Sequence, residues 1–477
     1  MLFNSFDFLL FFPIVCVLYF VIPSLKYRNL FLLAASYYFY MNWQPVYALL
    51  LLSSTGITYL ASLGIARSDE LRKKKGYLIA SLALNLAILF FYKYYGFVAE
   101  NVTALLNWLG IGLHIPELNL LLPVGISFYT FQALGYSIDV YRGDVKAEKN
   151  FFTYALFVSF FPQLVAGPIE RSTNLLQQFY KKHSFDGEDA IEGVKIMLWG
   201  YFMKLVLADR CAMYVDKVYN HINDHEGYST AVASLLFPFQ LYGDFAGYTF
   251  IAIGTARIMG FHLMDNFRRP YFFSNTIQEF WKRNHISLTT WFMDYVYYPL
   301  TTRSNTVNWW CFSIFLTFFI SGFWHGAAWT FVVWGALHGL LLVFEMKTIK
   351  RKKKWEKKHN LAKKEWYIWM QRICVFFILS FTLIFFRANS LSDAVDAIQL
   401  IFTPSDYSIE LARNRIVLCL FAIAILFVKE YLEEHKNQFS WQSRHKELCD
   451  DSWMIAISLY ILWFGVFDGG QFIYFQF

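Results

Sequence analysis

Residues 308–346 read NWWCFSIFLTFFISGFWHGAAWTFVVWGALHGLLLVFEM and contain one charged side chain, Glu345. A helix that spans the hydrocarbon core of a bilayer needs about 20 mostly apolar residues. The stretch has room for two such helices, at about 308–323 and 328–346, on either side of the Trp-His-Gly sequence that contains His325. It therefore predicts a helical membrane protein with a histidine between two spans.

The composition of the whole chain supports this class. Of 477 residues, 57% are hydrophobic and only 16% are charged, against about a quarter in soluble proteins. These values exclude a disordered, coiled-coil or ordinary water-soluble chain. We predict an all-α, polytopic membrane protein that forms one membrane-embedded domain over residues 1–477. The predicted spans are about 5–23, 29–43, 45–65, 77–98, 121–139, 308–323, 328–346, 366–387, 414–430 and 453–470.

The basic residues are clustered between predicted spans. Ten Lys or Arg residues lie within 347–364, and a second cluster lies within 67–75. Loops rich in Lys and Arg face the cytoplasm, so these clusters predict topology rather than nucleic-acid binding. With all basic loops inside, both termini are predicted to be extracytoplasmic, in a cytoplasmic (inner) membrane. The six cysteines are scattered, which indicates neither a disulfide framework nor a thiolate metal site.

The middle of the chain, about 150–300, does not read as simple spans. Pro162 and Pro168 interrupt one apolar run, and 272–300 is heavily polar. Irregular backbone at membrane depth survives only when it is buried in protein or lines a water-filled cavity. We therefore expect partial crossings and a cavity in this region.

His285 lies within EFWKRNHISLTTWFMDYVYYPL, residues 279–300. If this segment is one helix, with about 100° per residue, Trp281, His285 and Phe292 share an aromatic stripe opposite a polar stripe. The pattern predicts an amphipathic helix with His285 on its apolar side. Such a helix either lies in the bilayer interface or turns the histidine toward a pocket. A lone histidine in this setting is more often structural than chemical.

His325 and His338 are thirteen residues apart. On one helix this separation rotates them by about 220° and moves them about 20 Å apart, so they share a site only if the helix breaks. We therefore expect one of them to be chemical. His325 has the richer setting, because Gly322 and Gly326 allow close helix approach. His338 is expected either to pack as a satisfied residue or to line the site.

Asp244 and Arg257 are embedded in the apolar stretch FQLYGDFAGYTFIAIGTARIMGF. A buried carboxylate needs a partner or hydrogen bonds, so Asp244 either holds a neighbouring helix or lines a polar tunnel. Glu170 and Arg171 follow a predicted turn, where they either pair across a loop or hold a phosphate group. No zinc spacing, phosphate-binding loop, nucleophile elbow or dinucleotide fingerprint is present, and no metal site is predicted.

Five stretches, in this order, resemble the membrane-bound O-acyltransferases, specifically the bacterial branch around the alginate O-acetyltransferase membrane subunit. They are LLPVGISFYTFQALGYSIDVYRG, FPQLVAGPIERS, YGDFAGYTFIAIGTARIMGF, DNFRRPYFFSNTIQEFWKRNHISLTTWFMDYVYYPL and SGFWHGAAWTFVVWGALHGL. The resemblance covers residues 1 to about 390.

The resemblance implies a rim of helices around a thin core at about 121–346, with peripheral helices at 1–98 and 366–470 and a tunnel through the membrane. It implies that acetyl-CoA or another acyl-CoA is the donor, with no permanently bound cofactor, and that the acyl group leaves on a hydroxyl. His325 is then catalytic and His285 is its companion. Related systems hand the acyl group to an extracytoplasmic, SGNH-type partner enzyme that modifies a cell-surface polysaccharide.

The sequence departs from the family pattern at three places. Asn284 stands where the family often has Trp, Met293 stands where it often has Arg, and residues 301–304 replace a glycine-rich turn. Both histidines are retained, so the departures leave open the outer mouth, the acceptor and the partner. Asp244, Trp281, Trp324 and His338 are our candidates for lining the substrate site or tunnel.

We hypothesise that His325 is the general base on the acceptor hydroxyl, with an acyl-histidine intermediate as the alternative. His285 either hydrogen-bonds the thioester carbonyl or orients the acceptor. The main alternative function is a transporter or flippase for a lipid-linked sugar, which explains broken helices but not the Trp-His-Gly block. A scaffold that only anchors an extracytoplasmic enzyme is a further alternative.

Overall fold

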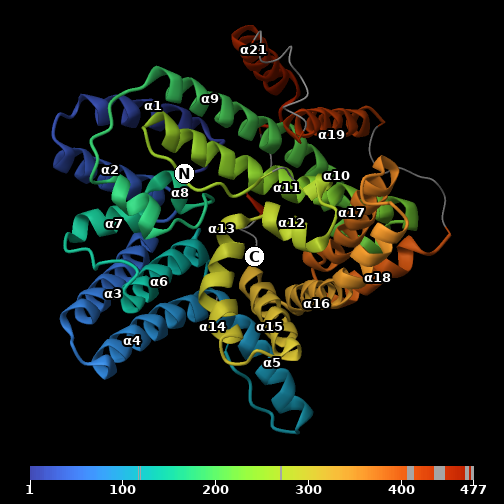
Figure 1. Ribbon diagram of the computed structural model, residues 1–477, viewed down its shortest axis with the longest axis horizontal. Coiled ribbons are helices and arrows are strands. Elements are labelled where there is room, and N and C mark those ends of the chain that lie inside the picture. The colour runs from blue at the N-terminus through green and yellow to red at the C-terminus, as the bar shows by residue number, and fades with distance from the viewer. Residues whose placement is uncertain are drawn as a thin grey trace. The chain divides into compact units, whose positions relative to one another are not determined.

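The computed structural model describes residues 1–116, 118, 120–268, 271–404, 413–434, 446–467 and 472–473, and every regular element within these ranges is a helix (Figure 1). The predicted all-α class is confirmed. The chain divides into two compact units. Unit 1 comprises Met1–Met197 and Thr249–Met264, and unit 2 comprises Leu198–Tyr248 and Asp265–Phe477.

The helices of unit 1 are mostly long and consecutive. They are α1 (Phe6–Val21), α2 (Leu25–Met41), α3 (Tyr47–Arg67), α4 (Leu71–Leu89), the π-helical turn η1 (Phe90–Tyr94), α5 (Tyr95–Trp108), α6 (Ile126–Arg142), α7 (Phe151–Ser159), α8 (Phe161–Leu164), η2 (Ser172–Leu176) and most of α9 (Gly187–Tyr201).

Unit 2 contains both short and long helices. They are η3 (Phe202–Ala208), α10 (Asp209–Tyr219), η4 (Ile222–Asp224), the first part of α11 (Gly227–Ile258), η5 (Tyr271–Phe273), α12 (Ile277–Arg283), α13 (Ile286–Phe292), η6 (Met293–Tyr297), α14 (Tyr298–Thr301), α15 (Val307–His325), α16 (Trp329–Lys358), α17 (Glu365–Arg387), α18 (Leu391–Ile401), α19 (Arg413–Glu434) and α21 (Lys446–Phe464).

Five helices are long and apolar enough to cross a membrane. They are Tyr47–Arg67, the continuous helix Leu71–Trp108, Val307–His325, Trp329–Lys358 and Glu365–Arg387. Each coincides with a predicted span, and together they make the chain a multi-pass membrane protein. The predicted span at 5–23 corresponds to α1, which has 16 residues. The predicted span at 453–470 overlaps α21, but residues 468–470 lie outside the described ranges.

Small polar side chains join the long helices of unit 1, where α3, α4 and α6 lie side by side (Figure 1). The Ser54 hydroxyl donates to the side-chain oxygen of Asn85 at 2.5 Å, and the hydroxyls of Ser81 and Ser137 lie 3.2 Å apart. All four residues are buried. Lipid gives helices no hydrophobic reason to associate, so close packing and hydrogen bonds between helices hold this part together.

The predicted interruption of 151–168 is confirmed. Helix α7 ends at Ser159, and α8 starts at Phe161 with Pro162 in its first turn. Proline has no N–H to continue a helical ladder. The Phe157 carbonyl near this break accepts hydrogen bonds from the side-chain amides of Gln132 at 2.7 Å and Gln163 at 2.8 Å. The break is therefore stabilised by side chains that replace backbone partners.

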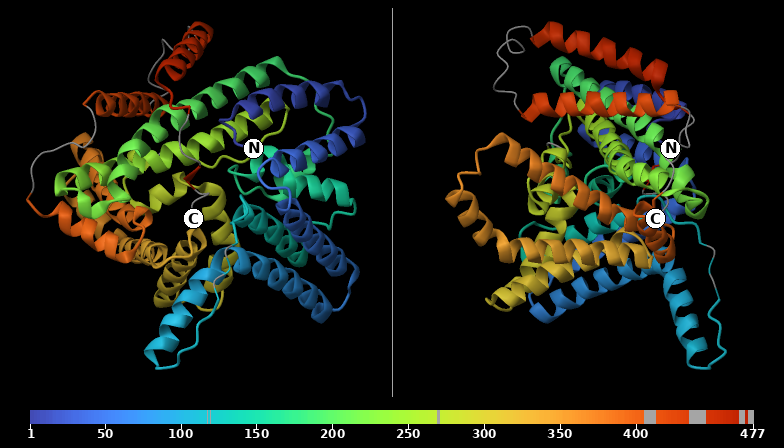
Figure 2. Two further views of the ribbon diagram at one scale, coloured as in Figure 1. Left: turned by 180° about the vertical axis from the view of Figure 1, so that it is seen from behind. Right: turned by 90° about the vertical axis from the view of Figure 1, so that its right-hand side faces the viewer.

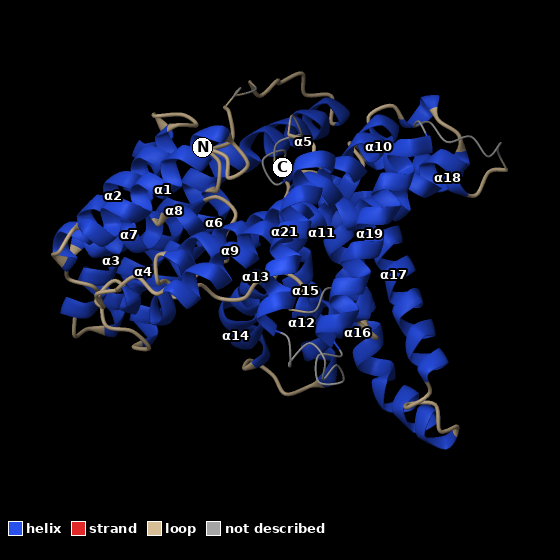
Figure 3. Cartoon of the chain, turned by 90° about the horizontal axis from the view of Figure 1, so that it is seen from above, coloured by secondary structure: helices blue, strands red, loops and turns tan. Residues whose placement is uncertain are grey.

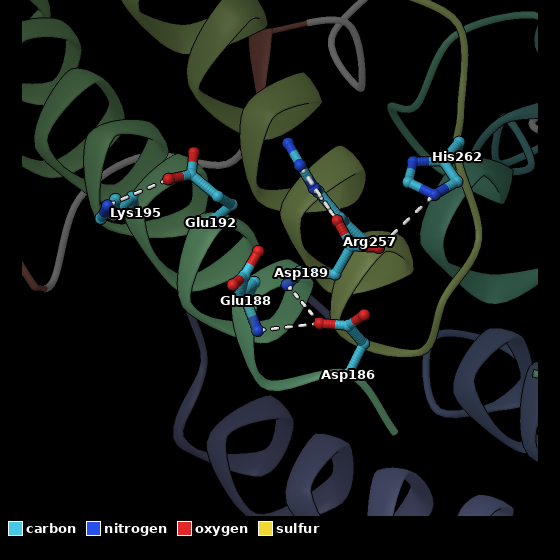
Figure 4. Close-up of polar contacts among 7 residues, drawn as sticks. All are labelled: Asp186, Glu188, Asp189, Glu192, Lys195, Arg257 and His262. Carbon is cyan, nitrogen blue, oxygen red and sulfur yellow. Dashed lines mark hydrogen bonds and ion pairs between the residues drawn. The ribbon is translucent and has the colours of Figure 1, made fainter. Parts of the chain in front are cut away.

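The charged residues of 170–264 hold loops of unit 1 together. The guanidinium of Arg257 forms an ion pair with Asp189 at 3.0 Å, and Nε2 of His262 lies 3.7 Å from the same carboxylate (Figure 4). The Asp186 carboxylate accepts the backbone N–H groups of Glu188 and Asp189 at 2.9 and 3.2 Å, which caps the start of α9. Arg257 thus has a structural partner that lies 68 residues away in the chain.

Glu170 is a buried carboxylate in the same unit. It accepts the backbone N–H of Met264 and, at 2.8 Å, the side-chain amide of Asn174. Of the two alternatives raised by the sequence, these contacts support a loop-holding role. Burial raises the pKa of Glu170 to about 7, against hydrogen bonds that lower it.

In unit 2, α15 and α16 pack closely side by side (Figures 1 and 2). A Cβ added to Gly322 would lie 2.8 Å from the Cα of Gly335, so both positions must lack a side chain. Gly322 therefore has the predicted helix-contact role. Gly326 lies beyond the end of α15, against the ring of Phe331. Helix α17 runs alongside α16 (Figure 3).

Replacement of Gly322 tests this contact. We expect Gly322→Ala to lower the thermal unfolding temperature of the purified protein, because the added methyl group forces α15 and α16 apart. Gly56→Ala in α3 is the control, since a Cβ there meets nothing within 4 Å and alanine favours the helix by about 1 kcal/mol. Equal unfolding temperatures for the two variants would contradict the packing argument.

Glu170 predicts a pH dependence of stability. A carboxyl whose pKa is raised on folding, from 4.5 to about 7, stabilises the fold below its unfolded pKa, and this contribution is lost as the pH rises through the folded pKa. We expect Glu170 to contribute a loss of stability on the order of 3 kcal/mol between pH 4.5 and 8, and Glu170→Gln to lessen the wild-type slope by that contribution. Thermal unfolding across this range measures both. Asp144→Asn, at an exposed carboxylate, should keep the slope.

Candidate active site

Unit 2 contains a partly open cavity with about 550 Å³ of empty space, lined by fourteen side chains from α11 to α17. Three histidines, His285, His325 and His338, contribute to the wall, and most of the remaining lining is aromatic or aliphatic. The cavity expected from the middle of the chain is present, and residues of α15, α16 and α17 complete its wall.

The first histidine lies at a break between two short helices. The single amphipathic helix predicted within 279–300 is wrong, because α12 ends at Arg283 and α13 begins at Ile286. His285 between them has left-handed backbone angles, φ 46° and ψ 51°, which non-glycine residues rarely adopt. A helical wheel assumes continuous right-handed geometry and cannot show such a residue. The break orients the ring of His285 toward the cavity.

Asn266 holds the segment after this break. Its backbone carbonyl accepts the N–H of Ile286 at 2.9 Å, and its side-chain oxygen accepts the N–H and the hydroxyl of Ser287 at 3.1 and 2.8 Å. The same oxygen lies 3.2 Å from Nδ1 of His285. Sequence reasoning missed Asn266. Its only signal was an amide side chain within the family-like stretch that begins at residue 265.

The second histidine lies at the end of a spanning helix. Helix α15 ends at His325 and α16 starts at Trp329, with extended backbone at Gly326. The ring of His325 has edge-to-face contacts with Trp324 and Trp334, both at 5.0 Å between centroids, and its centroid lies 6.4 Å from that of His285. Trp324 contacts this histidine but is not among the side chains that line the cavity.

The helix break also brings His338 to the cavity, although the sequence separation suggested a distant position. The indole N–H of Trp281 donates to Nδ1 of His338 at 3.3 Å, and Nε2 of His338 lies 3.1 Å from the Thr382 hydroxyl. That hydroxyl donates to the Leu379 carbonyl at 2.9 Å. Since Trp281 only donates, Nδ1 of His338 is the acceptor and Nε2 carries the proton. His338 therefore holds the Trp281 ring in place.

Asp244 belongs to a buried group of charges in unit 2. The Lys204 ammonium lies 2.7 Å from carboxylate oxygens of both Asp209 and Asp244, and all three residues are buried. The other oxygen of Asp244 accepts the backbone N–H of Ile473 at 2.6 Å. Asp244 is not among the residues that line the cavity, so its contacts support the structural alternative. Spacing did not predict its pairing with Lys204.

The described residues contain no group of three or more His, Cys, Asp or Glu side chains placed to hold a metal ion. Within those residues, the cavity wall also includes no carboxylate or ammonium group. The titratable side chains of this wall are the imidazoles of its three histidines and the hydroxyl of Tyr242.

Three imidazoles line the cavity of this membrane protein, and comparison with known proteins gives the class to which it belongs. Residues 146–387 match the membrane-bound O-acyltransferase family. The chain belongs to this family and is an O-acyltransferase.

Several relatives extend the match. The chain is 39% identical over 349 residues to the probable alginate O-acetylase AlgI of Pseudomonas putida, covering 72% of this chain and 70% of that protein. It is 31% identical over 423 residues to a peptidoglycan O-acetyltransferase of Helicobacter pylori, covering 82% of this chain and 77% of that protein. It is 28% identical over 283 residues to a teichoic acid D-alanyltransferase of Bacillus subtilis, covering 56% of this chain and 69% of that protein.

The buried charges predict a large stability effect. Lys204→Met leaves the carboxylates of Asp209 and Asp244 buried without their cation, and removal of one partner from a buried ion pair costs about 3–5 kcal/mol. We expect a strongly reduced unfolding temperature. The triple variant Lys204→Met, Asp209→Asn, Asp244→Asn should recover part of the loss, because no charge remains. A single Lys204→Met variant as stable as wild type would contradict the pairing.

Proposed function

We propose that this protein transfers an acetyl group from cytoplasmic acetyl-CoA to a hydroxyl group and so serves the O-acetylation of a cell-surface polysaccharide. Family membership supports the reaction class. The names of the relatives, an alginate O-acetylase and a peptidoglycan O-acetyltransferase, support acetyl as the group and an envelope polysaccharide as the final acceptor. An extracytoplasmic SGNH-type acyltransferase is the proposed partner that completes the transfer.

One observation carries the proposal: His285 and His325 are separated by 40 positions in the sequence, and their rings lie 6.4 Å apart on one cavity. Each is placed by a break in a helix. Two imidazoles at this separation allow one to take the proton of the acceptor hydroxyl while the other faces the thioester oxygen. General acid–base catalysis of this kind contributes about 10²–10⁴-fold in rate.

The reaction balances without a further cofactor. The acceptor oxygen attacks the thioester carbonyl as its proton passes to an imidazole nitrogen. The carbon–sulfur bond breaks, and the coenzyme A thiolate recovers the proton to leave as the thiol. In the alternative course, an imidazole nitrogen first takes the acyl group and then gives it to the hydroxyl. The aromatic wall suits either course because it excludes water that would hydrolyse the thioester.

The predicted orientation places the donor on the basic side of the membrane. The last turns of α16 carry much of the 347–364 cluster and extend beyond the apolar part of that helix. The positive-inside rule assigns this end to the cytoplasm, where acetyl-CoA is found. A cytoplasmic membrane with both termini extracytoplasmic remains the proposed arrangement.

Replacement of His325 tests the function. Wild-type protein with acetyl-CoA carrying a labelled acetyl group should release coenzyme A when a hydroxyl acceptor is present. We expect His325→Ala to reduce the rate by about 10²–10⁴-fold while expression is retained. His359→Ala is the control, because His359 is exposed at the end of α16. Wild-type rates in His325→Ala would overturn the proposal.

The same assay addresses the alternatives. A lipid-linked sugar transporter or flippase would release no coenzyme A, and family membership already favours the acyltransferase. If the chain only anchored an extracytoplasmic enzyme, substitution of both His285 and His325 would leave polysaccharide acetylation in the cell unchanged. We expect the double variant to abolish it.

A further inference from the structure

The hydrogen bonds around Asn266 determine which nitrogen of His285 carries its proton. Asn266 and His285 are 0% and 1% exposed, so water does not compete for these bonds. The backbone N–H of Ser287 lies 3.1 Å from a side-chain atom of Asn266, and a backbone N–H can only donate. The atom of the Asn266 amide that faces Ser287 is therefore its oxygen.

The same amide oxygen lies 3.2 Å from Nδ1 of His285. A carbonyl oxygen only accepts hydrogen bonds, so Nδ1 must be protonated. Burial disfavours a charged imidazolium, and a neutral imidazole carries one proton. The remaining nitrogen, Nε2, therefore holds the lone pair of a ring that lines the cavity.

We propose that Asn266 is a positioning residue that fixes this tautomer of His285, and that Nε2 of His285 takes the proton from the acceptor hydroxyl. This inference rests on the proposed acyl transfer. As the hydroxyl oxygen bonds to the thioester carbon, its proton moves to Nε2. The carbon–sulfur bond then breaks, and Nε2 returns the proton to the leaving thiolate.

The assignment gives His285 and His325 different roles in the proposed reaction. Of the two roles that the sequence left open for His285, orientation of the acceptor agrees with a lone pair on Nε2. A hydrogen bond from Nε2 to the thioester carbonyl does not, because the nitrogen has no proton to give. The contact with the thioester then falls to His325, at 6.4 Å between ring centroids. His325 remains necessary, but His285 is the base.

The backbone around His285 is consistent with this role. A non-glycine residue with left-handed angles costs about 1–2 kcal/mol. Asn266 offsets this cost by accepting the N–H groups of Ile286 and Ser287, the first two of α13. Asn266 thus holds both the ring and the unusual backbone angles of the residue that presents it.

The tautomer can be measured without any activity. We would label the histidines of the full chain with ¹⁵N and compare solid-state NMR spectra of wild type and His285→Asn in lipid bilayers. Asparagine tolerates left-handed angles, so this variant should keep the fold. The resonances lost in the variant should be those of a protonated Nδ1 and an unprotonated Nε2. A protonated Nε2, or a doubly protonated ring, would overturn the assignment.

A second arm tests the effect on transfer. Asn266→Asp keeps the acceptor oxygen and adds a negative charge, which favours the imidazolium form of His285. We expect the acid limb of the pH–rate profile to move up by about one pH unit or more. Asn266→Leu removes the amide oxygen that accepts from Nδ1 of His285. It should lower kcat at least about tenfold, which is less than the full contribution of a general base. An unshifted profile in Asn266→Asp would count against the inference.

Asn85→Leu separates positioning from general destabilisation. Asn85 is also a buried asparagine, 1% exposed, but it bonds Ser54 and Ser81 in unit 1. We expect folded Asn85→Leu to keep the wild-type pH profile and rate, and an equal loss in Asn85→Leu and Asn266→Leu would contradict a positioning role. Absence of coenzyme A release by wild type would defeat the proposed function, whereas the NMR result decides the tautomer on its own.

Discussion

The structure depends on one constraint, that buried polar groups must find partners within the protein. An unpaired buried amide or hydroxyl costs several kcal/mol in an apolar environment. At the break after α7, Gln132 and Gln163 supply hydrogen bonds to the Phe157 carbonyl. At the break before α13, the backbone carbonyl of Asn266 accepts the N–H of Ile286, and its side-chain oxygen accepts the N–H of Ser287. These two breaks in buried helices are stable because polar groups of Gln132, Gln163 and Asn266 are placed to complete the hydrogen bonds.

The same constraint applies to the buried charged groups of unit 2, which pair with each other and do not line the cavity. The Lys204 ammonium pairs with the carboxylates of Asp209 and Asp244, each at 2.7 Å. All three residues are almost wholly buried. They stabilise unit 2, and Asp244 also binds the backbone at Ile473. The described wall of the cavity is left to aromatic, aliphatic, amide and imidazole groups. The thioester that we propose as the donor would meet no fixed charge in this wall, and the proposed proton transfer uses its imidazoles.

Of the ten predicted spans, five coincide with described helices that are long and apolar enough to cross a membrane, because twenty apolar residues have few alternatives to a spanning helix. Helices α3, α15, α16 and α17 begin and end within a few residues of the predicted bounds, apart from the charged extension of α16. The sequence also identified His285 and His325 as the pair of interest through family resemblance. Neither periodicity nor spacing showed that they meet, because the meeting depends on two breaks.

The errors have a common physical origin. A wheel drawn within 279–300 assumed one helix, but His285 has left-handed angles that no hydrophobic pattern encodes. For His325 and His338 a helix break was the condition for a shared site, and the extended residue Gly326 provides that break. Asn266 and Thr382 gave no signal, since a single amide or hydroxyl in an apolar stretch is common. Their importance appears only when their hydrogen-bond partners, 19 and 44 residues away, are known.

The two hydrogen-bonded histidines illustrate how such partners decide chemistry. His338 accepts from Trp281 at Nδ1, so its proton lies on Nε2 and points to Thr382. His285 faces an amide oxygen at Nδ1, so its proton lies there and Nε2 is the basic nitrogen. Identical side chains on one cavity thus have opposite tautomers. In His338 both nitrogens are occupied by protein groups, which makes it a support for Trp281. In His285 the nitrogen opposite Asn266 carries the lone pair, which makes this ring the one suited to accept a proton from a substrate.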